Sequence, residues 1–161
     1  MIGIDPGTRI AGYGIVEIQR QKTASRPRAV AAGAWSLGSK SHLSVRLGTL
    51  ALEFRRVIEA YQPTHLCIEL SFMAENPRTA LFLGHARGVI LSEGYLSGLQ
   101  ISEISATSAK KLISGNGRAD KLEVAKAMSS LLGFPLEKLP YDATDALAIA
   151  YARLMKERDF F

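Results

Sequence analysis

Apolar and polar residues alternate over the N-terminal part of the chain and then recur at helical spacing. This pattern predicts three strands, over residues 2–5, 11–19 and 29–37. The polar and basic residues 20–28, which include Pro27, predict a hairpin loop between the second and third strands. The apolar side chains of residues 43–61 recur at the spacing of an amphipathic helix, which we expect to end before Pro63.

The second half of the chain alternates short apolar runs with helical segments. The apolar runs predict two further strands, over residues 64–70 and 100–104. Start signals predict four more helices, from Asn76-Pro77, Ser105, Asp120 and Pro140 to about residues 93, 113, 132 and 158. This order predicts one α/β domain over residues 1–161, with a five-stranded mixed sheet flanked by helices on both faces. A right-handed crossover can place the fourth strand beside the first and parallel to it.

Composition narrows the class of protein. The chain has 161 residues, of which 47% are apolar and 22% charged, as expected for a globular domain with a hydrophobic core. The chain has a single cysteine, Cys67, which lies in an apolar run. One cysteine cannot form an internal disulfide or a cysteine-based zinc site. No apolar stretch could span a bilayer and no signal-peptide pattern is present, so we expect a cytoplasmic protein. The net charge of +5 is compatible with a nucleic-acid partner.

Two of the predicted strands end in an acid. Asp5 follows an apolar run and precedes the turn Pro6-Gly7, and Glu69 stands near the end of the fourth strand. Taken alone, Asp5 fits a turn-capping role as well as a ligand role. If the first and fourth strands are adjacent and parallel, however, the two carboxylates are neighbours. Like charges in a low-dielectric site require a cation or the protonation of one of them.

Two more acids open the last predicted helix. Asp142 and Asp145 are three residues apart and share a helix face. Asp142 also suits the N-terminal end of the helix dipole, whereas Asp145 precedes an apolar run that must pack on the sheet. Together the four acids offer only hard oxygen ligands, which favours Mg²⁺ or Mn²⁺ over Zn²⁺. Two such ions about 4 Å apart form the arrangement used for in-line phosphodiester chemistry.

Five sequence blocks carry a family resemblance. They are residues 3–8 (GIDPGT), Ile68-Glu69 with Phe72-Met73-Ala74 and Asn76, residues 84–89 (GHARGV), residues 115–121 (GNGRADK) and residues 142–148 (DATDALA). In this order and at these spacings they resemble the RuvC-type Holliday-junction resolvases, within the RNase H-like nuclease superfamily. The similarity spans nearly the whole chain. Two positions depart from the family pattern, because Leu70 replaces a commonly polar residue and Glu75 replaces a common Lys.

The resemblance implies a crossover junction endodeoxyribonuclease with a metal site at Asp5, Glu69, Asp142 and Asp145. It implies a homodimer that cuts two opposed strands of a four-way DNA junction in recombination and repair. It also implies cooperation with the branch-migration proteins RuvA and RuvB. Some members have His at the position of Asp145, which adds proton handling to the roles of that residue.

The same resemblance bears on the residues around the acids. Lys110 and Lys121 match family lysines near the scissile phosphate, where a cation can stabilise developing charge. Phe72 is expected to stack on an unpaired base of the junction. Arg118, at a loop before a helix, and Arg78 are further candidates for phosphate contacts. Salt bridges would explain Arg78 and Arg87 equally well, and a surface charge explains Lys111.

Two other classes of protein share part of this pattern. The first sequence block also occurs in actin-like ATPases, but their two large lobes cannot be built from 161 residues. A related RNase H-like nuclease that acts on RNA stays open as an alternative. We expect the helix that begins at Pro77 to form part of the dimer interface, because small residues such as Gly84, Ala86 and Gly88 allow close approach.

Overall fold

The computed structural model describes residues 1–20, 25–70, 76–133 and 136–158. Its strands are β1 (Ile2–Asp5), β2 (Ile10–Arg20), β3 (Ser25–Ser36), β4 (His65–Glu69) and β5 (Gln100–Ile104). Its helices are α1 (Leu43–Tyr61), α2 (Pro77–Leu96), α3 (Ala106–Ser114), α4 (Lys121–Leu132) and α5 (Tyr141–Arg158), with a short 3₁₀ turn η1 (Leu136–Lys138). No described helix has the length and apolar character needed to cross a membrane.

The five strands form one mixed sheet in the order β3-β2-β1-β4-β5. β1 and β2 pair antiparallel, whereas β1 and β4 pair parallel, with Ile4 opposite Ile68. The predicted placement of the fourth strand beside the first is therefore confirmed. Because parallel strands end at the same edge of a sheet, Asp5 and Glu69 lie next to each other at the carboxyl ends of β1 and β4.

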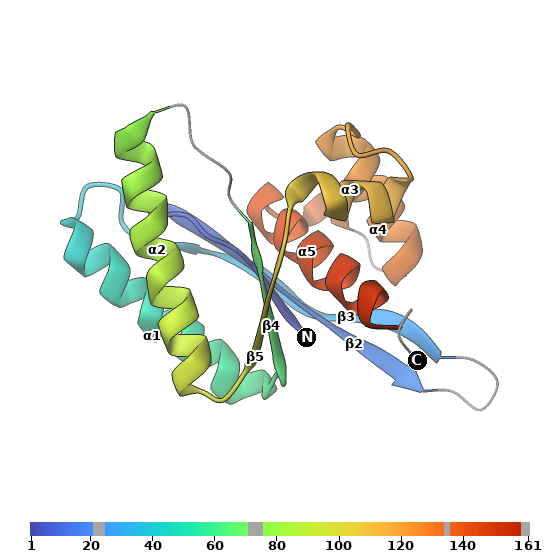
Figure 1. The fold of residues 1–161 in the computed structure, drawn as a ribbon, viewed down its shortest axis with the longest axis horizontal. Helices are drawn as coiled ribbons and strands as arrows, with labels where there is room; N and C mark the ends of the chain where they lie inside the picture. The colour runs from blue at the N-terminus through green and yellow to red at the C-terminus, as the bar shows by residue number, and fades with distance from the viewer. Residues whose placement is uncertain (21–24, 71–75, 134–135, 159–161) are drawn as a thin grey trace.

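Helices cover both faces of the sheet, as predicted (Figure 1). On one face, Leu50 and Phe54 of α1 pack with Ile2 and Ile4 of β1 in the larger core cluster. On the other face, α5 lies against the sheet and is flanked by α3 and α4, with Leu147 in a second core cluster. Because side chains alternate along β1, Ile2 and Ile4 both point to the face that α1 and α2 cover.

The opposite face of β1 and β2 lacks side chains at three positions, which lets α5 approach closely. A Cβ built on Gly12 would lie 1.9 Å from the Asp142 carbonyl oxygen, and one on Gly3 would lie 2.2 Å from the Ala146 carbonyl oxygen. A Cβ on Gly14 would meet the backbone of α5 in the same way. These three glycines, called the glycine stripe below, form a strip of strand surface without side chains on which α5 lies. They set the distance between α5 and Asp5.

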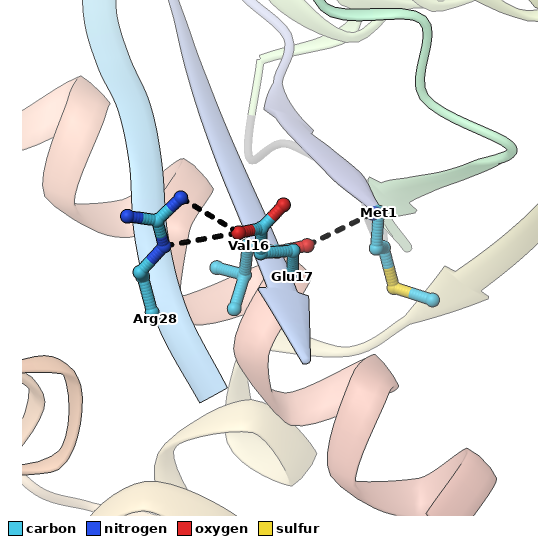
Figure 2. Close-up of polar contacts among 4 residues, drawn as sticks. All are labelled: Met1, Val16, Glu17 and Arg28. Carbon is cyan, nitrogen blue, oxygen red and sulfur yellow. Dashed lines mark hydrogen bonds and ion pairs between the residues drawn. The ribbon is translucent and has the colours of Figure 1, made fainter. Parts of the chain in front are cut away.

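The predicted hairpin loop over residues 20–28 is wrong at both ends, because β2 extends to Arg20 and β3 begins at Ser25. Glu17 pairs with Arg28 across these strands, and the Arg28 Nη2 lies 2.8 Å from Glu17 Oε1 (Figure 2). The N-terminal amine of Met1 donates to the Val16 carbonyl at 2.9 Å nearby. Exposed strands pair through their backbones and have no buried face, so the apolar alternation that predicts strands is absent here.

The helix boundaries follow the predicted caps closely. Asn76 accepts a hydrogen bond from the backbone of Arg78, and Ser105 accepts one from Ser108. Asp120 and Glu123 form a complete capping box at the start of α4. The one clear difference is at the end of α2, which continues to Leu96 instead of ending near residue 93. No Gly in a left-handed conformation interrupts it before Gly98.

Candidate active site

Asp5 and Glu69 form a carboxyl pair at the shared edge of β1 and β4. The charge of Glu69 raises the pKa of Asp5, and a side-chain contact with Asp5 lowers the pKa of Glu69 against the larger, raising effects of burial and Asp145. The structure therefore brings together the first two acids that the sequence predicted.

Helix α5 carries the other two acids to the same edge. Asp142 lies in its first turn and Asp145 one turn further on. Both act electrostatically on Asp5, and Asp145 also acts on Glu69. Asp142 lies near Asp5 because α5 packs directly on Gly12. Gly12 pairs with Asp5 across the sheet and contacts the backbone of Asp142. All four predicted acids thus converge from β1, β4 and α5.

The environment of Asp5 disfavours its charge. Burial raises the pKa of Asp5, and the neighbouring charges of Glu69, Asp145 and Asp142 raise it further, to about 7 against an ordinary value of 3.8. The positive charge of Lys121 lowers the pKa of Asp5 and offsets only part of this rise. The pKa of Glu69 is also raised, first by burial and then by Asp145. The site therefore concentrates more negative charge than its own cations balance.

Two lysines line this site, as the sequence predicted. Lys121 Nζ lies 3.0 Å from Asp145 Oδ2, and this hydrogen bond is the main cause of the raised pKa of Lys121. The same ammonium lies 5.5 Å from the centre of the Tyr141 ring. Lys110 of α3 lowers the pKa of Glu69 from across the site. Both ammonium groups are therefore close to where a phosphate would meet the acids.

A cavity of about 220 Å³ opens beside the acids. Its walls come from β4, α3, α4 and α5, and its lining includes Glu69, Lys110, Lys121 and Asp145 together with apolar residues such as Val124 and Ile149. The cavity thus combines an acidic edge, two cations and an apolar floor. Such a mixture suits a polyanionic substrate whose reacting group must be held out of bulk water.

The donors at this site fit a hard divalent cation by their chemistry. All four are carboxylates, and their mutual repulsion in a half-buried site would be relieved by a cation. As the side chains stand, however, no three Asp, Glu, His or Cys residues of the described ranges are grouped tightly enough to hold a metal ion. One reason is visible in the structure, because Asp145 is bound to Lys121.

Arg87 holds the end of β4 in place. Its Nη1 donates to the Glu69 carbonyl oxygen at 2.5 Å, and its Nη2 lies 2.5 Å from Glu103 Oε1 on β5. The salt-bridge interpretation of Arg87 is therefore correct. Its bond to the backbone of an active-site acid was not predicted, because sequence spacing gives no information on contacts between α2 and β4.

The other predicted residues lie elsewhere. Arg78 sits over the Phe82 ring, 5.6 Å from its centre, and lines a different cleft. Arg118 is exposed on the loop between α3 and α4 and is absent from the lining of the acidic cavity. Phe72 and Glu75 fall outside the described residues. The structure therefore brings together the four acids with Lys110 and Lys121, and leaves the two arginines apart from them.

Comparison with known proteins gives a consistent result. The family model described as crossover junction endodeoxyribonuclease RuvC matches residues 1–153. A protein of that name from Stutzerimonas stutzeri is 45% identical over 93% of this chain and 83% of its own length. One from Heliobacterium modesticaldum is 38% identical over 93% of this chain and 90% of its own length.

Solved structures agree with the sequence matches. The structure of Thermus thermophilus RuvC superimposes with a TM-score of 0.87 at 25% identity and covers 99% of this chain and 97% of that one. The yeast mitochondrial Holliday junction resolvase Ydc2, at 14% identity and a TM-score of 0.67, shares the fold. The predicted RNase H-like fold is thereby confirmed. With a family match over nearly its whole length, the chain belongs to the RuvC family of crossover junction endodeoxyribonucleases.

Proposed function

We propose that this chain resolves four-way (Holliday) DNA junctions by symmetric, metal-dependent phosphodiester hydrolysis, in homologous recombination and DNA repair. The observation that carries the proposal is the convergence of Asp5, Glu69 and the two acids of α5 at one sheet edge, with Lys110 and Lys121 beside them. A chain of this family that kept its fold but had lost nuclease activity would have no need for four mutually repelling carboxylates.

The RuvC family depends on divalent metal ions. The proposed ion here is Mg²⁺, with Mn²⁺ as a substitute, and two ions would be held by Asp5, Glu69, Asp142 and Asp145. Bound there, such ions supply an activated water and charge stabilisation for the leaving 3′ oxygen. The protein's own contribution is to hold the four carboxylates on rigid elements, at the ends of two central strands and the first two turns of a buried helix.

Lys110 and Lys121 are the proposed partners of the scissile phosphate. Lys121 is bound to Asp145 in this structure, so it holds one of the four acids until substrate and metal compete for both groups. Each ammonium would then neutralise charge that develops on the phosphate oxygens. Phe72, Arg78 and Arg118 remain proposed DNA contacts, with Phe72 expected to stack on an unpaired base.

The proposed assembly is a homodimer, which would present two active sites to opposed strands. A groove of about 780 Å³ runs between α1 and α2. Gly48, Gly84 and Gly88 line it, and beyond their own stretch of helix no described residue has an atom within 4 Å of where their Cβ atoms would be. Leu81, which is 60% exposed, borders the same groove. A mass measurement in solution tests the dimer, and pull-down with RuvA and RuvB tests the partners expected from the family.

The deciding assay compares three substrates with the same protein. A synthetic four-way junction, a linear duplex of the same sequence and a structured RNA are incubated with Mg²⁺ and, separately, with EDTA. Symmetric nicking of the junction alone, dependent on Mg²⁺, supports the proposal, and cleavage of RNA alone would refute it. Asp5→Asn should abolish cutting while junction binding persists, because it removes a ligand and leaves the phosphate-binding surface. Asp120→Asn is the matched control, since Asn caps a helix as well as Asp does.

A further inference from the structure

A second cleft lies beside the turn that follows Asp5, on the side of α1 and α2. It encloses about 470 Å³ between this turn and the starts of the two helices. Three arginines line it, together with neutral polar residues, and the principal lining residues are Thr8, Arg9, Arg46, Asn76, Arg78 and Thr79. The acidic cavity, by contrast, is bordered by α3, α4 and α5. The two sites therefore lie on opposite flanks of the same sheet edge.

The charge of this cleft is not neutralised within the described part of the chain. Among the described residues, no carboxylate lines it, and the ion pairs that these residues form involve other arginines and a lysine. Arg46 donates from Nη1 to the Thr8 carbonyl oxygen at 3.0 Å, while its buried Nε has no acceptor in the described ranges. Three guanidinium groups thus share one cleft whose described lining carries no negative charge.

Two of these guanidinium groups are held in place by uncharged partners. Arg46 is anchored by its bond to the turn, and Arg78 rests on the Phe82 ring. Such contacts fix direction and leave the positive charge available to an anion. A guanidinium held in this way presents a planar set of donors that matches the oxygens of a phosphate. The chemistry of the cleft therefore selects a phosphate group.

The cleft also lies within reach of a strand bound at the acidic site. Arg9 follows Asp5 by four residues, which limits the separation of their Cα atoms to about 14 Å. That distance corresponds to about four nucleotides of one DNA strand. A neighbouring cavity of about 460 Å³ shares Thr8, Arg9 and Phe82 with the cleft and adds the apolar Ile10 and Leu83. An apolar wall beside a phosphate site suits the sugar of the same nucleotide.

We propose that the cleft of Arg9, Arg46 and Arg78 binds a backbone phosphate of the DNA strand on the α1–α2 side of the cut. This inference rests on the proposed junction-cleaving function and adds a second anchor to it. The strand would be held by lysines on one side of the acids and by arginines on the other. Cations on both sides fix the direction of the strand across the site, which a single cluster cannot do.

The test uses Arg9→Gln/Arg78→Gln, because both side chains are exposed, whereas Arg46 supports the turn through Thr8. Junction Kd is measured in EDTA at several KCl concentrations. Loss of the single phosphate contact of the cleft should weaken binding about tenfold and lower the slope of log K against log salt by about 1 per protomer. The control, Arg56→Gln/Lys138→Gln, removes the same formal charge from residues that line neither cavity and should change the slope by less than half as much.

A scan with methylphosphonates locates the contact. One neutral linkage at a time is placed on either side of the cut. We expect one position that weakens binding by wild-type protein and has no further effect on the double variant. An unchanged Kd and salt slope in the double variant would overturn the proposal. So would wild-type binding of inorganic phosphate that the double variant loses while its junction Kd is unchanged. If wild-type protein neither binds nor cuts the junction, it is the proposed function that fails.

Discussion

Replacing Asp5 by Asn should stabilise the metal-free protein at neutral pH while it removes nuclease activity. Asp5 has its pKa raised to about 7, mainly by burial and then by the three other acids. Between its ordinary value of 3.8 and about 7 the folded protein holds a proton that the unfolded chain has released. Stability is therefore highest below that window and falls as pH rises through it. Above pH 7 the cost of the ionised Asp5 is fully present.

The size of this cost follows from the same values. A rise from 3.8 to about 7 corresponds to about 4 kcal/mol at high pH, as an upper bound. We expect Asp5→Asn to recover about 2 kcal/mol of this upper bound, because burying the polar Asn amide also has a cost. For a domain of this length, that gain raises Tm by about 4–8 °C. Asn keeps the shape of Asp and carries no charge at any pH.

The measurement is thermal unfolding in EDTA at pH 8 and at pH 4. The stabilisation should be present at pH 8 and nearly absent at pH 4, where Asp5 is protonated in the folded wild type. Mg²⁺ should raise the Tm of the wild type more than that of the variant, because the ion replaces the repulsion that Asn removes. Asp120→Asn, which keeps its helix cap, should shift Tm little at either pH. A variant less stable than wild type at pH 8 in EDTA would refute the reasoning.

Three further substitutions test how the site is held together. Gly12→Ala places a methyl group 1.9 Å from the Asp142 carbonyl, so α5 must shift, and we expect a loss of about 1–3 kcal/mol in stability and about 100-fold in single-turnover cleavage. Lys121→Gln frees Asp145, so Mn²⁺ titration without DNA should show tighter binding while junction cleavage falls about 100-fold; weaker Mn²⁺ binding would contradict this. Arg87→Gln removes the bond to the end of β4 and should lower the free energy of unfolding by about 1–3 kcal/mol in urea, with slower cleavage.

The sequence predicted the sheet and its acids because each depends on local patterns. An apolar run that ends in a carboxylate marks both Asp5 and Glu69, and the crossover from β3 through α1 places β4 beside β1. The N-terminal ends of α3 and α4 were predicted from the N-cap residues Ser105 and Asp120. These features rest on a few adjacent residues, and tertiary contacts did not override them.

What could not be predicted depends on contacts between distant segments. The pairing of Lys121 with Asp145 joins residues 24 apart in the chain, and the bond from Arg87 to Glu69 joins residues 18 apart. Neither has a sequence signature. The length of the β2–β3 hairpin was underestimated for a different reason, because its outer residue pairs, from Glu17 with Arg28 to Arg20 with Ser25, are held by backbone pairing and an ion pair instead of a buried face.

The glycine stripe and the acid cluster both depend on the contact between α5 and the sheet. Glycine within a strand costs about 0.5–1 kcal/mol relative to alanine, and a buried acid with a raised pKa costs more. Gly3, Gly12 and Gly14 recover part of that cost by letting α5 pack directly on the sheet. The same contact brings Asp142 and Asp145 over Asp5, which creates the repulsion. Filling the stripe and neutralising Asp5 should therefore both reduce cleavage while they move stability in opposite directions, because the first displaces the helix and the second relieves the charge.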